Sequence, residues 1–218
     1  MSRITDYAFL FQKSFGTSGV NSIGSFQLSQ LNSSSVQAQL KAAGINTNSK
    51  QYKSAVKQMM SAGNGAMYGN IQGIKNLMSH YDKDGDYINP VNGLSGLLVT
   101  DENESSRKKI ISIPDSSKEE MYELTKKEFL RENGVCNGDT TRRSDVYNNL
   151  YRKMQKKDRL AAGYTLEKYE RIYRQAFYDA AKKADPNWEI GKPIKEGALD
   201  NVTRESIEAK KSLAQSTV

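Results

Sequence analysis

Two long stretches of helical periodicity in the second half of the chain set the strongest limit on its fold. They cover about residues 141–162 and 165–184, and each is followed by a helix breaker, Gly163 after the first and Asp185–Pro186 after the second. Neighbouring helices with so short a connection pack as an antiparallel hairpin. The sequence therefore predicts a mainly α protein with a multi-helix, bundle-like body.

A further helix is expected directly before the hairpin. Ser117 and Glu120 have the spacing of a capping box, and Asn133–Gly134 is typical of a helix end. In front of this helix, residues 80–114 lose the helical period, and Ile110, Ile111 and Ile113 form a brief β-prone run. We expect an irregular central region with at most a short β segment near residues 110–113.

The first half of the chain shows three shorter helical patterns. Ser33 or Ser34 can cap the first, and Gly44 can end it. Asn48 or Ser49 can start the second, which runs to the Gly63–Asn64–Gly65 cluster. The apolar faces of the second and third patterns consist of Tyr52, Val56, Met59 and Met60, and of Met67, Ile71, Ile74, Leu77 and Met78.

Composition divides the chain into three parts. Residues 1–35 combine an amphipathic segment, with Ile4, Tyr7 and Phe11 at helical spacing, and a linker rich in Gly, Ser, Asn and Gln. The amphipathic segment either folds back on the body or acts as a detachable docking helix. Residues 36–200 form the helical body, and residues 201–218 a polar helix or tail.

Several classes of protein are disfavoured by residue usage. Cys136 is the only cysteine and His80 the only histidine, so neither a disulfide framework nor a zinc site of Cys and His can form. No run of about 18 apolar residues would form a transmembrane segment. The run Ala8–Phe11 is much shorter than a secretory h-region, so the default compartment is the cytoplasm, with non-classical export as the alternative.

An acidic loop at residues 81–89 is the sharpest local motif. Carboxylates on alternate residues, Asp82, Asp84 and Asp86, can converge on a hard cation, and Asn89 could add an oxygen. The loop resembles the first half of an EF-hand calcium loop. It departs from that family where Tyr87 replaces the turn glycine and Gly93 replaces the closing glutamate. Two interpretations remain, a weak calcium site and a plain turn in which Asp side chains bind neighbouring amides.

The positive charge of the chain is concentrated in the predicted hairpin, residues 141–184. Residues 142–183 contain twelve basic and five acidic side chains, an excess of seven that equals the net charge of the whole chain, +7. The later helix is largely self-neutralised by acid-before-base pairs such as Glu167 and Arg171. The earlier helix should carry a stripe of basic residues at positions i, i+4 and i+7. The residues expected to bind an anionic partner are Arg152, Lys153, Lys156, Lys157 and Arg159.

Six tyrosines alternate with these charges. Basic residues beside aromatic rings can hold phosphates and stack bases, which points to nucleic acid. The helical period, however, also sends several of these rings toward the core, where they need no ligand. The tyrosines are Tyr147, Tyr151, Tyr164, Tyr169, Tyr173 and Tyr178.

Three functions follow from these features. The leading hypothesis is a non-enzymatic interaction or structural protein with a protein partner, because the sequence contains no recognisable catalytic motif. The alternative is a protein that binds nucleic acid or another polyanion through the hairpin. The third is an enzyme whose carboxylates meet only in the fold. No feature of the sequence sets an oligomeric state.

Overall fold

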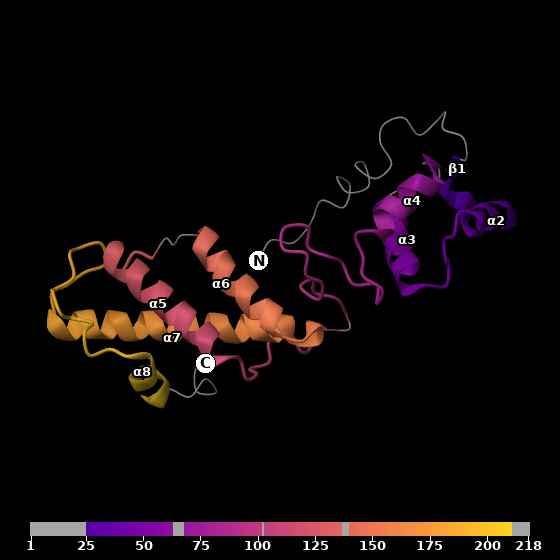
Figure 1. The fold of residues 1–218 in the computed structure, drawn as a ribbon. Helices are drawn as coiled ribbons and strands as arrows, with labels where there is room; N and C mark the ends of the chain where they lie inside the picture. The colour runs from indigo at the N-terminus through magenta and orange to yellow at the C-terminus, as the bar shows by residue number, and fades with distance from the viewer. Residues whose placement is uncertain (1–24, 63–67, 102, 137–139, 211–218) are drawn as a thin grey trace. The chain divides into compact units, whose positions relative to one another are not determined.

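The computed structural model describes residues 25–62, 68–101, 103–136 and 140–210 (Figure 1). Contacts divide the chain into two compact units, Met1–Leu98 and Val99–Val218. The boundary falls inside the irregular segment that the sequence placed within one helical body, residues 36–200. The amphipathic segment expected near residues 4–15 lies outside the described residues. The prediction of a mainly α protein is confirmed.

The first unit combines short helices with a small antiparallel ladder. Phe26 pairs with Gly69 and Gln27 with Tyr68. The elements are, in chain order, β1 (Phe26–Gln27), the 3-10 helix η1 (Leu28–Gln30), α2 (Ser34–Ala42), α3 (Lys50–Ala62), β2 (Tyr68–Gly69) and α4 (Ile71–Met78).

The described part of the expected linker, residues 25–35, differs from the flexible segment that its composition predicts. Phe26, Leu28 and Leu31 are all buried in the core of this unit. Full burial of such a side chain stabilises the fold by about 1.5–3 kcal/mol, and the three together offset part of the entropy cost of ordering this mostly polar segment. A composition dominated by Gly, Ser, Asn and Gln does not show that these few apolar side chains are buried.

Local signals set the ends of the helices in the first unit. The Val36 amide donates to the Ser33 hydroxyl at 3.3 Å, and Gly44 takes φ +78°, so both predicted caps of α2 are confirmed. Asn70 caps α4, which places Gly69 in β2 rather than in the helix. Met60 is 45% exposed and does not share the buried face expected for it.

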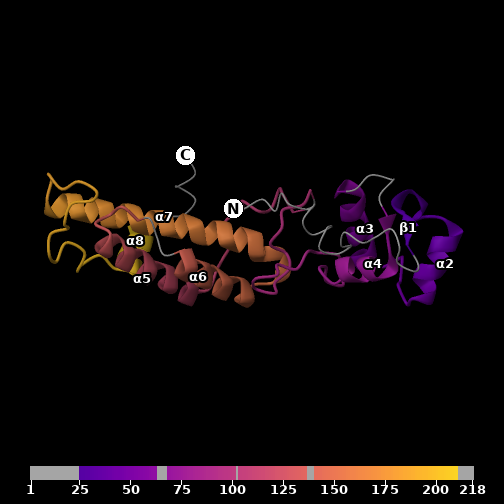
Figure 2. The ribbon, with the colours of Figure 1, turned by 90° about the horizontal axis from the view of Figure 1, so that it is seen from above.

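The second unit is a helical bundle with a short terminal helix against it (Figure 1). α7 lies alongside both α5 and α6 (Figure 2). Its elements are α5 (Asp115–Arg131), α6 (Thr140–Lys153), the 3-10 helix η2 (Lys156–Asp158), α7 (Arg159–Ala184) and α8 (Arg204–Lys210).

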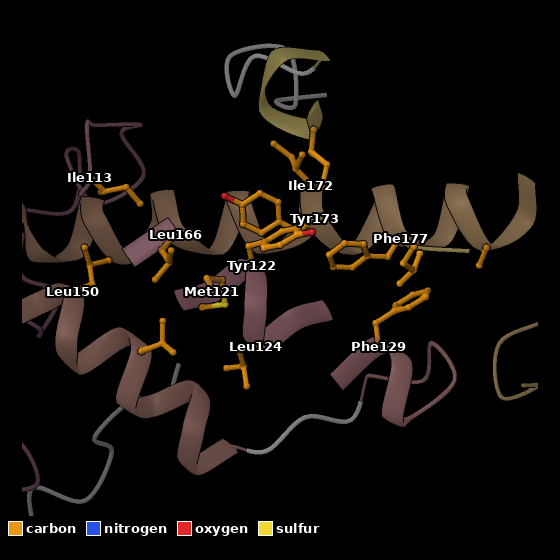
Figure 3. Packing of buried hydrophobic residues seen from close by; sticks show 14 of the residues in the cluster. Ile113, Met121, Tyr122, Leu124, Phe129, Leu150, Leu166, Ile172, Tyr173 and Phe177 are labelled. Atoms are coloured by element: carbon orange, nitrogen blue, oxygen red, sulfur yellow. The ribbon is translucent and has the colours of Figure 1, made fainter. Parts of the chain in front are cut away.

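Aromatic packing between α5 and α7 forms the core of the second unit (Figure 3). Tyr122 meets Tyr173 edge to face with ring centroids 5.5 Å apart, and Phe129 meets Phe177 at 5.8 Å. α8 contributes Ile207, which is buried in the same core, so the expected polar tail includes a packed helix.

The predicted helix break at Gly163 is wrong. α7 runs from Arg159 to Ala184 through Gly163, and the chain reverses instead at residues 154–158. Gly163 lies against the ring of Tyr151 in α6, where a side chain would not fit. Gly163 thus allows a close contact between α6 and α7. In the sequence, a glycine at such a contact looks the same as a glycine that ends a helix.

The predicted cap of α5 is also corrected. α5 begins at Asp115 after Pro114, and Ser117 lies buried inside its first turn instead of capping it. Proline has a fixed φ and no N–H group, so it suits a helix start by itself.

The run at residues 110–113, where at most a short β segment was expected, forms no strand. The Ile111 amide donates to Thr165 Oγ1 of α7 instead of pairing with a strand.

Candidate functional site

The five predicted anion-binding residues lie around the turn between α6 and α7. Arg152 and Lys153 end α6, Lys156 and Lys157 belong to η2, and Arg159 starts α7. The expected stripe along one helix is therefore wrong, because the chain reverses here so that both helices can bury their apolar faces. The reversal gathers the five cations at one end of the bundle instead.

Two lysines from outside the hairpin join this group. Thr165 Oγ1 accepts a hydrogen bond from the Ile111 amide at 3.1 Å and lies 3.5 Å from the Lys109 carbonyl oxygen. The segment before α5 is thus held against the first turns of α7, where Lys108 and Lys109 are exposed. We call the combined surface the basic end, and it consists of Lys108, Lys109, Arg152, Lys153, Lys156, Lys157 and Arg159.

The contacts of single residues show which charges are offset. Lys153 Nζ lies 3.3 Å from Glu120 Oε1 and 3.1 Å from Ser116 Oγ, so α5 neutralises part of its charge. Arg159 Nε donates to the Tyr151 carbonyl at 3.1 Å, in the last turn of α6. Lys108, Lys109, Arg152 and Lys157 are exposed to solvent, and Lys156 is half-buried.

The helix that starts at Arg159 adds to the positive field. Its 26 residues are preceded by Asp158, whose side chain makes no capping hydrogen bond to the helix. The N-terminal end of a helix carries a partial positive charge from its aligned peptide dipoles. That end of α7 coincides with the basic end, so the dipole adds to the field of its cations, and the Asp158 carboxylate offsets part of that field.

Most of the hairpin tyrosines belong to the core. Tyr173 is fully buried, and Tyr147, Tyr169 and Tyr178 pack against the same cluster. The fold thus confirms the core position expected for Tyr169 and Tyr173, and it adds Tyr147 and Tyr178 to the same cluster. The two other tyrosines differ: Tyr151 packs on Tyr147 and Gly163, and Tyr164 has the Lys168 ammonium 5.2 Å from its ring centroid.

Sequence reasoning missed Lys108 and Lys109. Their signal is the short basic run Arg107–Lys109, but no periodicity relates this run to the hairpin. Only the contact between Thr165 and the segment 109–111 brings it to α7. The charge counted over the hairpin alone therefore leaves out two of the positive charges at this end of the bundle.

The acidic loop has the geometry of a tight turn. Asp82 Oδ1 accepts from the amides of Asp84 at 2.9 Å and Asp86 at 3.0 Å, and the Ser95 hydroxyl donates to Oδ2 at 2.7 Å. Asn89 likewise accepts from a backbone amide, that of Val91. Within the described ranges no group of three or more His, Cys, Asp or Glu side chains is arranged to hold a metal ion. Calcium binding stays a prediction.

The fold brings two buried carboxylates together, as the third hypothesis requires. Glu128 of α5 and Glu170 of α7 both contact Arg143 Nη2, at 2.6 and 3.1 Å, and Arg174 adds a second contact to Glu170 at 2.6 Å. Two guanidinium groups thus neutralise two carboxylates. An open groove of this unit lies elsewhere, beside Ala176, Ala180 and Ile207.

A family model described as Domain of unknown function (DUF3879) matches residues 45–218, well over half of the chain. The chain belongs to this family. Both the acidic loop and the basic end lie within the matched residues. No curated protein and no solved structure matches the chain. In the part of the chain that the structure describes, no helix is long and apolar enough to cross a membrane.

Proposed function

We propose that this protein is a non-enzymatic interaction protein whose second unit binds the phosphate backbone of nucleic acid through the basic end. The observation that carries the proposal is the convergence of Lys108 and Lys109 with the cations of the α6–α7 turn. Two segments far apart in sequence thereby add to one positive surface. Such a role fits the cytoplasm, the compartment that the sequence predicts by default.

The composition of the basic end favours a row of phosphates as its partner. Five of its members are exposed, and lysine binds phosphate as a point charge without demanding one fixed geometry. Neutralising phosphates releases counterions, so binding of this kind depends steeply on salt. An acidic protein would meet the same charges, and the experiment below separates it from nucleic acid.

The arrangement of buried acids supports a non-enzymatic role. A general acid or base needs a carboxylate that can exchange a proton with a substrate. Glu128 and Glu170 are instead held by Arg143 inside the bundle. Burial raises the pKa of the Cys136 thiol, which disfavours the thiolate that a cysteine nucleophile requires.

Fluorescence anisotropy with a labelled oligonucleotide of mixed sequence tests the proposal. With about five phosphate contacts to a single strand, the affinity should fall roughly 100-fold between 50 and 200 mM salt. Lys108→Glu with Lys109→Glu should weaken binding strongly. The matched control is Lys53→Glu with Lys57→Glu, which makes the same change in net charge on exposed positions of α3 and should have a small effect.

Two results would overturn the proposal. Equal losses in the two double variants would mean that net charge, and not the basic end, attracts the oligonucleotide. Binding of labelled polyglutamate without binding of the oligonucleotide would assign the surface to an acidic protein.

A further inference from the structure

We propose that the basic end binds single-stranded nucleic acid, with one unpaired base stacked on the ring of Tyr164. This inference rests on the proposed function and adds the class of nucleic acid. It starts from the different surroundings that the fold gives to the hairpin tyrosines. The structure describes every residue from 140 to 184.

Tyr164 differs from Tyr169 and Tyr173 in what covers its ring. Those two rings pack on each other with centroids 6.0 Å apart, and the Lys118 ammonium lies 5.2 Å from the ring centroid of Tyr169. The ring of Tyr164 is partly exposed and has the ammonium of Lys168 over it at 5.2 Å. A base that displaces this flexible side chain can stack on the ring of Tyr164, whereas the ring of Tyr169 would still be covered by Tyr173.

The position of Tyr164 in α7 puts the residue in the same helical turns as the basic end. Thr165, its neighbour in the chain, holds the segment that carries Lys108 and Lys109. Arg159 precedes Tyr164 by five residues, which is about 7.5 Å along a helix axis and about 140° around it, so the two residues lie on different faces of α7. A phosphate next to a stacked base would meet Lys168, beside the ring, and the neighbouring nucleotides of the strand would extend to the basic end.

The chemistry of this arrangement distinguishes single strands from duplexes. Every base has a π face, and an aromatic side chain stacks on an unpaired base regardless of its identity. In a duplex both faces of a base are already covered by neighbouring base pairs, so Tyr164 has no face to meet. Duplex DNA can then use the lysines and arginines but gains nothing from the ring.

Anisotropy titrations of the full chain with a 12-nucleotide single strand and with a duplex of the same sequence test this inference. Tyr164→Ala should weaken single-strand binding about 10-fold, within the range known for one stacked base, and leave duplex binding within about twofold. Tyr164→Phe keeps the ring and should bind as the wild type does. Tyr68→Ala removes a partly exposed tyrosine of the first unit and serves as the control.

The outcomes separate this inference from the proposed function. If Tyr164→Ala binds the single strand as tightly as wild type, or weakens both ligands equally, the stacking inference is wrong. The proposed function still stands in that case if Lys108→Glu with Lys109→Glu weakens binding. Failure of wild type to bind either oligonucleotide would refute both. A melting curve of each variant shows whether a loss reflects unfolding.

Discussion

A Cβ atom at Gly163 would stand 2.5 Å from the hydroxyl oxygen of Tyr151 and 3.1 Å from the nearest ring carbon. This contact joins the last turn of α6 to the second turn of α7. It explains why a residue that destabilises most helix interiors occurs within the longest helix described.

Gly163→Ala should destabilise the protein. Overpacking against a half-buried ring costs about 1–3 kcal/mol, and the better helix propensity of alanine returns about 1 kcal/mol at most. Urea unfolding followed by circular dichroism measures the difference. Tyr151→Phe removes the closest atom, so the alanine should cost less in that background. A stabilised Gly163→Ala variant would show that the contact is loose.

Removing Arg143 should be among the most destabilising changes in the second unit. Arg143→Met leaves Glu128 and Glu170 without the guanidinium between them, and breaking a buried ion pair costs about 3–5 kcal/mol. Arg171→Met is the control, because Arg171 is 68% exposed and pairs with Glu167 on the surface, where a pair contributes about 0.5 kcal/mol. Similar losses in both variants would argue against this network.

Alkaline pH should weaken the fold through Tyr151. Burial raises the pKa of this phenol to about 12, whereas in the unfolded chain it is about 10. The folded state keeps the proton to higher pH, so the contribution is complete below about pH 10. Between about pH 10 and 12 it falls by about 1.4 kcal/mol per pH unit. Urea unfolding across this range should show a shallower decline in Tyr151→Phe, and parallel curves would contradict the burial.

The acidic loop should depend on Asp82. Asp82→Ala removes the oxygen that accepts from the amides of Asp84 and Asp86 and should cost about 1–2 kcal/mol, whereas Lys83→Ala, at an exposed neighbour, should cost little. Thermal melts with chelator and with millimolar calcium decide between the two interpretations of the loop. A plain turn predicts coinciding melts, and a calcium site predicts a rise in melting temperature that is specific to calcium.

Features that depend on a few neighbouring residues were predictable from sequence. Ser33 caps α2, Gly44 ends it in a left-handed conformation, and Asn133–Gly134 ends α5 with positive φ at both residues. Each of these depends on a short-range hydrogen bond or on a backbone conformation that few residue types adopt. Tyr169 and Tyr173 of α7 likewise followed the helical period into the core.

The positions of residues distant in sequence were decided only by the tertiary structure. Gly163 has the local signature of a helix end, and only the ring of Tyr151 shows that it is a contact point. Lys108 and Lys109 join the basic end because a hydroxyl in α7 binds the segment that carries them. Sequence by itself determined the helical class, both caps of α2, the end of α5 and the excess of positive charge. Long-range packing decided where that charge collects, because periodicity reports which face of a helix is buried and not what lies against it.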